Sequence, residues 1–248
     1  RAGEMTLTVA ECAGVLWDAV VVGTGIGGAT VGYELARRGH RVLFVEKGPF
    51  LHAGFDAAPG ELARAIVGSR EPRSAKSQDS FAARRLAAGR WPHRVRANTN
   101  LGMLNFAAPV GCMSGGSSAF YAAALERFAP ADFRPRANFP AARAATLPER
   151  WPVSYEELAP FYAAAETIFR VRGTQDPLFT GGSSDLLEPP PLSPRDQRLY
   201  DIFSSLGLHP YRAHVGCEFV AGCTGCPNGP CERACKQDAA WACLIPAL

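Results

Sequence analysis

The sequence has no unbroken apolar run close to the ~18 residues that a membrane-spanning helix needs. Residues 1–12 also lack the apolar segment of a signal peptide. We therefore expect no membrane span and a cytoplasmic location for this chain.

The sequence also has no large excess of positive or negative charge. The 26 Lys and Arg residues nearly balance the 23 Asp and Glu residues, leaving a formal net charge of +3. The basic residues are scattered and form no stripe or tail of the kind that nucleic acid binding requires. The sequence therefore predicts no nucleic-acid partner. An apolar content of 47% over 248 residues is ample for the core of one large domain or two intertwined ones.

The clearest motif begins at Asp18. Residues 18–22 form a short β-branched apolar run, typical of a strand buried on both faces. They lead into residues 23–28 (Gly-Thr-Gly-Ile-Gly-Gly), after which apolar residues recur at helical spacing. Residues 41–46 predict a second strand. The order strand, glycine-rich turn, helix, strand is that of a Rossmann-type βαβ unit, which binds a dinucleotide.

Each glycine of the turn has its own physical role. Gly23 permits the tight turn, Gly25 lets the backbone approach a pyrophosphate, and Gly28 allows close packing of helix on strand. Free N–H groups and the positive end of the helix dipole favour phosphate at the helix start. The predicted cofactor-binding residues of this turn are Gly23, Gly25, Ile26, Gly27 and Gly28.

The end of the second strand indicates which dinucleotide binds. Glu46 is placed to accept hydrogen bonds from the ribose hydroxyls of an adenosine, and its charge disfavours NADP. Glycines continue at Gly32 and Gly39, and Gly32 would let the helix lie close to the sheet. This extended spacing, with Glu46, Lys47 and Gly48 after the strand, resembles the N-terminal FAD site of two-domain flavoproteins. We expect FAD, with Glu46 and Lys47 among its contacts and NAD as the alternative.

Beyond this unit, nearly the whole chain resembles the bacterial branch of the glucose–methanol–choline (GMC) oxidoreductases. Residues 115–119 (Gly-Gly-Ser-Ser-Ala) resemble the second flavin loop of that family, and we expect a helix after them through Glu126. Residues 125–128, 132–133 and 151–162 also resemble the family. Glycines in such a loop allow close backbone approach to the flavin, and serines can cap a helix or bind phosphate oxygen. The resemblance adds Gly115, Gly116, Ser117 and Ser118 to the predicted FAD contacts.

The resemblance implies an α/β fold: a Rossmann-like FAD-binding domain of GMC type with part of an interleaved substrate domain. FAD-binding segments are expected at residues 1–60 and 98–135, with an inserted lid or loop region at 61–97. A partial substrate or cap region follows at 136–215, and the Cys-rich segment 216–248 returns to the FAD domain. Within the cap region, Ser154 with Glu157 has the spacing of a capping box, and Ser193-Pro194 predicts the start of another helix.

Two departures from the family pattern matter for chemistry. Members with covalent FAD carry the link on a histidine at about the position of Phe120, so we expect non-covalent FAD here. The family's substrate-oxidising histidine lies near the C-terminus of a longer chain, and the five histidines present match no catalytic motif. We therefore expect no catalytic residue in this chain, which corresponds to the N-terminal part of such an enzyme and would be inactive alone.

Six of the eight cysteines fall between Cys217 and Cys243. Without an export signal, such clustering favours a metal or redox site over a disulfide framework. Sulfur-only ligation favours zinc or an iron–sulfur cluster. The spacing Cys226-x4-Cys231-x3-Cys235 is similar to that in iron–sulfur-containing catalytic subunits of some bacterial sugar dehydrogenases of this family. Those subunits typically have Pro after the last cysteine, where this chain has Lys236. Iron–sulfur cluster, zinc, disulfides and free thiols all stay open, and the candidate metal ligands are Cys223, Cys226, Cys231 and Cys235.

The leading prediction of function is an FAD-dependent alcohol or sugar dehydrogenase or oxidase. Hydride would pass from the C–OH carbon of the substrate to flavin N5, and the electrons would leave to an acceptor that the sequence does not identify. The alternatives are a non-catalytic FAD-binding or metal-binding fragment, and an FAD enzyme of another class, such as an amine oxidase.

Overall fold

The computed structural model describes residues 7–50, 75–141, 144–223, 226, 229–231 and 233–248. The chain folds into two compact units. The first unit comprises residues 1–122 and 220–248, and the second comprises residues 123–219. The finer division into five segments stays a prediction, and its expected boundary between residues 60 and 61 lies outside the described residues.

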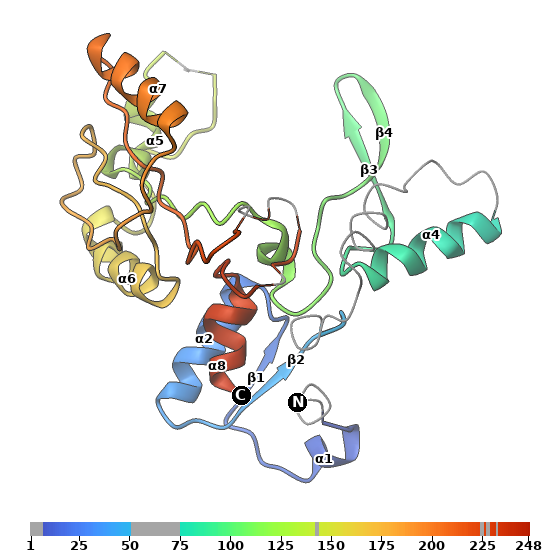
Figure 1. Cartoon of the computed structure of the whole chain (residues 1–248). Helices are drawn as coiled ribbons and strands as arrows, with labels where there is room; N and C mark the ends of the chain where they lie inside the picture. Colours follow the sequence, from blue (N-terminus) through green and yellow to red (C-terminus); the bar gives the residue numbers. More distant parts are fainter. Residues whose placement is uncertain (1–6, 51–74, 142–143, 224–225, 227–228, 232) are drawn as a thin grey trace. The chain divides into compact units, whose positions relative to one another are not determined.

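The first unit contains the expected βαβ arrangement. Strands β1 (Ala19–Val22) and β2 (Val42–Val45) pair in parallel, with Ala19 opposite Val42 and Val22 opposite Val45. Helix α2 (Ile26–Arg37) connects them and packs on the pair (Figure 1). The prediction of a Rossmann-type βαβ unit and of a mixed α/β fold is confirmed.

Only one face of this strand pair is covered in the described part of the chain. Alternate side chains of β1 are exposed, since Val20 keeps 58% and Val22 82% of its surface accessible. Helix α2 packs its buried residues Ala29 and Gly32 on the opposite side. The prediction of a strand buried on both faces is therefore wrong for the described residues, because β-branched composition alone does not say how many layers cover a strand.

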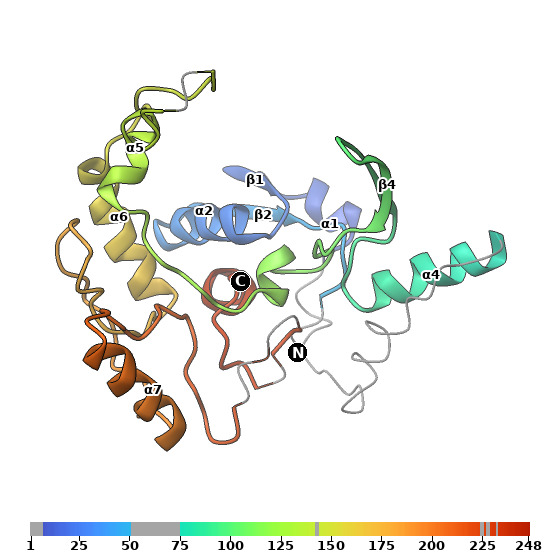
Figure 2. The ribbon, with the colours of Figure 1, turned by 90° about the horizontal axis from the view of Figure 1, so that it is seen from above.

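The described residues of the first unit form several further elements. They are α1 (Val9–Ala13), α4 (Ala75–Ala87), the antiparallel hairpin of β3 (Arg94–Thr99) and β4 (Gly102–Ala107), the 3-10 helix η2 (Gly116–Phe120), the π-helical turn η4 (Ala240–Leu244) and α8 (Ile245–Ala247). The continuous turn η4–α8 packs alongside α2 (Figures 1 and 2). Residues from the end of the chain therefore support the helix of the N-terminal motif.

The expected helix through Glu126 is not formed. The 3-10 helix η2 stops at Phe120 because Tyr121 is extended (φ −73°, ψ 168°) and Ala123 is left-handed (φ 61°). A left-handed residue cannot continue a right-handed helix.

The second unit contains η3 (Pro130–Phe133), α5 (Pro135–Asn138), α6 (Tyr155–Ile168) and α7 (Pro194–Ser205). Ser154 caps α6 as predicted, because its backbone N–H donates to Glu157 Oε2 over 2.7 Å and its hydroxyl accepts from the Glu157 N–H. Ser193 caps α7 by accepting from the Asp196 N–H over 3.1 Å. Both predicted helix starts are confirmed.

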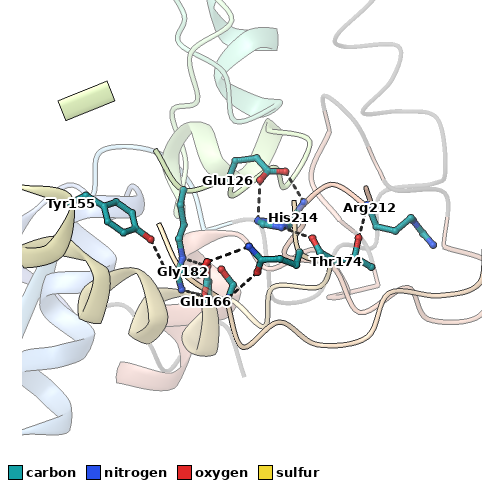
Figure 3. A network of polar contacts seen from close by, with 10 residues as sticks. Glu126, Tyr155, Glu166, Thr174, Gly182, Arg212 and His214 are labelled. Carbon is teal, nitrogen blue, oxygen red and sulfur yellow. Dashed lines mark hydrogen bonds and ion pairs between the residues drawn. The ribbon is translucent and has the colours of Figure 1, made fainter. Parts of the chain in front are cut away.

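A polar network holds the interior of the second unit (Figure 3). Arg127 forms two hydrogen bonds of 2.6 Å to the Glu166 carboxylate, and both side chains are 6% exposed. The hydrogen bond to Glu166 raises the pKa of Arg127 well above its ordinary value, against the effect of burial. Nearby, buried His214 places Nε2 2.9 Å from the Thr174 carbonyl and Nδ1 2.9 Å from Glu126. These two contacts hold the His214 side chain within the second unit.

Among the described residues, no helix combines the length and the apolar character that crossing a membrane requires.

Candidate cofactor site

The glycine-rich turn leaves open space in front of helix α2. Gly23 adopts φ +88°, and Gly25 precedes the first helical residue with no side chain capping the helix. A Cβ atom added to Gly25 or Gly27 would meet no atom within 4 Å. The first N–H groups of a helix have no partner inside the helix. This turn therefore presents main-chain donors and positive dipole to an anionic group such as a pyrophosphate.

Two further glycines set the distance between α2 and the strands. A Cβ atom on Gly28 would lie 2.1 Å from the Gly23 carbonyl oxygen, and one on Gly32 would lie 2.2 Å from Cε1 of Phe44. Both separations are far inside van der Waals contact, so neither position accepts a side chain without a shift of its neighbours. The predicted packing roles of Gly28 and Gly32 are confirmed.

The second glycine loop lies against the first. Gly115 and Gly116 both adopt left-handed backbone conformations, with φ of +82° and +57°. A Cβ atom on Gly116 would lie 3.0 Å from Cα of Gly25, and the Gly115 N–H donates to Thr24 Oγ1 over 3.3 Å. Two loops that are about 90 residues apart in sequence thus meet at the start of α2.

The serine hydroxyl groups of the second glycine loop form hydrogen bonds with main-chain groups and so stabilise the loop. Ser117 Oγ accepts from the Gly111 N–H over 3.0 Å, and Ser118 Oγ donates to the Gly115 carbonyl over 2.6 Å. Ser118 Oγ also accepts from the Ala239 N–H over 2.9 Å. Ser118 is buried and Ser117 is exposed, so Ser117 has the more accessible hydroxyl for a ligand.

Glu46 joins the end of β2 to the glycine-rich turn. Its carboxylate accepts from the Thr24 N–H (2.9 Å), the Thr24 hydroxyl (2.8 Å) and the Gly48 N–H (2.9 Å). A carboxylate offers about four lone-pair positions, which leaves about one for a ribose hydroxyl. Lys47 places Nζ 3.7 Å from the centre of the Trp91 ring.

Sequence reasoning missed Thr24, which is 1% exposed and bridges Glu46 to Gly115. The sequence signal for Thr24 is weak, because it consists of one hydroxyl-bearing residue within the glycine motif. Sequence reasoning also missed Asp238, which is fully buried and accepts from the N–H groups of Ala240 and Trp241 over 2.9 and 3.1 Å. Asp before an apolar helical segment is a recognisable helix-start signal.

Phe120 is a core residue of this unit. It is 5% exposed and packs with Met113 and Ala119. The guanidinium carbon of Arg90 lies 3.9 Å from the centre of its ring. Burial lowers the pKa of Arg90, and the charge of Arg85 lowers it further.

None of the eight cysteines forms a disulfide within the described part of the structure. Cys235 Sγ lies 3.5 Å from Cys223 Sγ and 3.3 Å from Cys231 Sγ. Cys226 has a left-handed backbone (φ 38°), and its carbonyl accepts from Lys236. Cys243 lies elsewhere, 3.7 Å from Thr30 Oγ1 on α2, and burial raises the pKa of its thiol.

Main-chain amides surround one thiol of this group. Burial raises the pKa of Cys231, but hydrogen bonds from the Lys236 amide, the Cys235 thiol and the Arg233 amide lower it, so that the pKa lies below its ordinary value. Hydrogen bonds to sulfur favour the thiolate, which is the form that binds metals.

Lys236 fixes the Cys-rich loop to the end of the second glycine loop. It is 1% exposed, and Nζ contacts the carbonyl oxygens of Ala119 (2.8 Å), Tyr121 (3.2 Å), Cys226 (3.2 Å) and Gly229 (2.5 Å). The structure therefore brings together the two glycine loops and, through Lys236, the cysteine loop. Direct contact with the cofactor stays a prediction for each of these residues.

Comparison with known proteins adds a family and several relatives. The family described as "FAD dependent oxidoreductase" matches residues 18–173. The chain is 27% identical over 243 residues to paromamine 6′-oxidase of Streptomyces fradiae and 28% identical over 242 residues to 6‴-hydroxyparomomycin C oxidase of Streptomyces lividus. Both alignments cover 93% of this chain, but only 38% and 39% of the relatives. The chain thus spans less than two fifths of the length of these curated relatives.

Among solved structures, pyridoxine 4-oxidase from Mesorbium loti has 21% sequence identity and a TM-score of 0.45. That comparison covers 92% of this chain and 39% of the other.

Proposed function

The chain belongs to the FAD dependent oxidoreductase family, and from this premise we propose that it forms the FAD-binding part of a GMC-type oxidoreductase of the bacterial branch. The whole protein would oxidise a CH–OH group of an alcohol or sugar. The observation that carries the proposal is the close approach of the two glycine loops at the uncapped start of α2, where the Gly115 N–H donates to Thr24 Oγ1.

The residues of the first unit fit an FAD molecule. Open space at Gly25 and Gly27 leaves room for a pyrophosphate against the helix start. The Thr24 hydroxyl holds Glu46 on one side and Gly115 on the other, and so fixes both glycine loops around one position. Glu46 retains about one free lone-pair position for a ribose hydroxyl. Bound FAD would supply the hydride-accepting N5 atom.

We propose non-covalent binding of FAD. Phe120 has no nucleophilic atom, and its ring is packed into the core with Met113 and Ala119. No flavin link can form at this side chain.

The substrate class follows from the relatives. Two of them are named as oxidases of paromamine and of 6‴-hydroxyparomomycin C, and both align with nearly all of this chain. We propose that the whole protein acts on a hydroxyl group of a comparable small polar molecule. Because this chain spans less than two fifths of those relatives, oxidation is proposed for the whole protein and flavin binding for this part of it.

Titration of the purified chain with FAD, followed by quenching of flavin fluorescence, tests the proposal. Thr24→Val keeps the side-chain shape but removes the hydroxyl between Glu46 and Gly115. Hydrogen bonds to charged groups contribute about 1.5–3 kcal/mol, so we expect Kd to rise about 10-fold to 100-fold. Thr24→Ser keeps the hydroxyl and serves as the matched control, with Kd near that of the parent chain. A chain that is folded by circular dichroism and binds no FAD would contradict the proposal.

The substrate is tested separately on the full-length gene product. Flavin reduction under anaerobic conditions is followed by absorbance on addition of paromamine or simple primary alcohols. Reduction by one of these classes supports the assignment. Reduction by amines that carry no hydroxyl group, without reduction by alcohols or sugars, would replace it with an amine oxidase.

A further inference from the structure

Residues 236–241 pack against the second glycine loop within the first unit. The Ala239 N–H donates a hydrogen bond to Ser118 Oγ over 2.9 Å. A Cβ atom added to Gly115 would lie 3.3 Å from Cβ of Ala240, the first residue of η4. The start of this C-terminal turn is therefore in contact with the loop that we place at the cofactor.

Ser118 uses its hydroxyl group within the protein. The residue is 8% exposed, and Oγ donates to the Gly115 carbonyl over 2.6 Å while it accepts from the Ala239 N–H. A serine hydroxyl has a single proton to donate. Because the Gly115 carbonyl takes that proton, Ser118 has none left for an oxygen atom of a ligand. An effect of Ser118 on a bound cofactor therefore passes through its neighbours in the protein.

Gly115 is held at both of its main-chain polar groups. Its carbonyl accepts from Ser118, and its N–H donates to Thr24 Oγ1 over 3.3 Å. Its φ of +82° lies in the left-handed region. Glycine enters this region without steric cost, but the absence of a Cβ atom also leaves it free to adopt other conformations. The contacts with Ser118 and Thr24 therefore have to fix the loop in place.

The contacts of Thr24 extend this path to Glu46. Thr24 Oγ1 donates to Glu46 Oε2 over 2.8 Å, and the Thr24 N–H donates to the same oxygen over 2.9 Å. Thr24 is 1% exposed. Hydrogen bonds in a buried network depend on one another, so the loss of one member changes the others. Ser118 and Glu46 are thus joined through Gly115 and Thr24.

We propose that Ser118 is a positioning residue for the adenosine half of FAD. It holds Gly115 against Thr24, and Thr24 holds the Glu46 carboxylate in the orientation that accepts a ribose hydroxyl. The inference rests on the proposed function, which places the ribose at Glu46. It differs from the sequence-based prediction, in which Ser118 contacts FAD itself as part of a second flavin loop.

Binding of FAD and of ADP by the purified chain, compared between the parent and Ser118→Ala, is the first test. ADP carries the adenosine and both phosphates but no flavin, and its Kd is obtained by competition with FAD. We expect Kd for FAD to rise about 10-fold in the variant, and Kd for ADP to rise by the same factor. A rise for FAD alone would place Ser118 at the flavin and overturn the proposal.

The ribose hydroxyl locates the effect within ADP. An acidic residue at the end of the second strand binds the 2′-hydroxyl, so the parent should bind ADP about 10-fold more tightly than 2′-deoxy-ADP. This preference should shrink in Ser118→Ala, because a displaced Glu46 no longer meets the hydroxyl. A serine that only stabilised the fold would lower the midpoint of urea unfolding and leave the preference of the folded chain as it is. An unchanged preference in folded Ser118→Ala therefore overturns the proposal.

Thr30→Val is the matched control. It removes a hydroxyl group from α2, in the same unit, where Thr30 Oγ1 donates to the Ile26 carbonyl over 2.6 Å. We expect Kd for FAD and the preference for ADP over 2′-deoxy-ADP to equal those of the parent. Losses as large as those of Ser118→Ala would show a general effect of removing a hydroxyl, which also overturns the proposal.

Should Ser118→Ala fail to fold, Ser118→Cys takes its place, because a thiol keeps a weaker donor and acceptor in a side chain of similar size. Smaller losses of the same kind are expected, and affinities and a preference equal to those of the parent would overturn the proposal. The parent separates this inference from the proposed function. A folded parent that binds no FAD contradicts the flavin site, whereas a parent and a Ser118→Ala variant that bind FAD equally well contradict the positioning role alone.

Discussion

The Lys236 ammonium donates a hydrogen bond to the carbonyl oxygen of Ala119, 117 residues earlier in the sequence, over 2.8 Å. The same nitrogen contacts the carbonyls of Cys226 and Gly229 in the Cys-rich loop. One buried cation thus joins the 3-10 helix of the second glycine loop to the cysteine loop.

Lys236→Met should destabilise the first unit strongly. The substitution keeps the approximate length of the side chain but leaves buried carbonyl oxygens without their charged donor, at a cost of about 3 kcal/mol or more. Lys47→Met is the matched control, because the exposed Lys47 ammonium over Trp91 contributes only about 0.5–1 kcal/mol. Urea unfolding followed by tryptophan fluorescence measures both. Equal losses in the two variants would contradict the role of Lys236.

Gly32→Ala tests the packing of α2 on β2. The added methyl group would lie 2.2 Å from the Phe44 ring, and overpacking of this kind costs about 1–3 kcal/mol. In a Phe44→Leu background the clash is removed, so the same substitution becomes neutral or gains up to about 1 kcal/mol from helix propensity. A double-mutant cycle on unfolding free energies measures the coupling. Gly27→Ala in the same helix meets no neighbour and serves as the control.

Arg127→Met should reduce the stability of the second unit. It leaves the Glu166 carboxylate buried without its bidentate partner, and loss of one member of a buried ion pair costs about 3–5 kcal/mol. Arg37→Gln breaks an ion pair with Glu34 at the surface, where Arg37 is 62% exposed and solvent screens the pair, and should cost far less stability. Differential scanning calorimetry compares the two. A smaller loss for Arg127 than for Arg37 would mean that the buried pair contributes no net stability.

Glu218 should make the stability of the second unit depend on pH. Its hydrogen bond to Arg170 lowers its pKa most, and contact with Arg172 lowers it further. Since the folded pKa lies below the ordinary value of 4.5, this contribution is fully present above about pH 4.5 and is lost as the pH falls through the folded pKa. Melting temperatures between pH 3 and pH 7 should therefore decrease less steeply on the acid side for Glu218→Gln than for the parent. Parallel curves would contradict the assignment.

The local features that were predicted correctly from the sequence depend on residues that are close together in the chain. The glycines of residues 23–28, the capping pair at Ser154 and the helix start at Ser193 act within a few residues, and the structure has them as expected. The sequence could not predict contacts between distant segments, such as Gly115 with Thr24 or Lys236 with Ala119. The expected helix through Glu126 failed for a related reason, since the left-handed backbone of Ala123 has no marker such as glycine or asparagine.

The long reach of these contacts affects the order in which the protein is built during synthesis. The glycine turn and α2 can form once the chain has been made through β2, because β1 and β2 are close in sequence. Thr24 must then wait for Gly115, and Ala119 must wait for Lys236, separations of 91 and 117 residues. Closing loops of this length is slow, because the chain loses conformational entropy before the contacts that stabilise the closed loop can form. The cradle therefore stays open until Lys236 has been translated, and a cofactor would be held firmly only after that point.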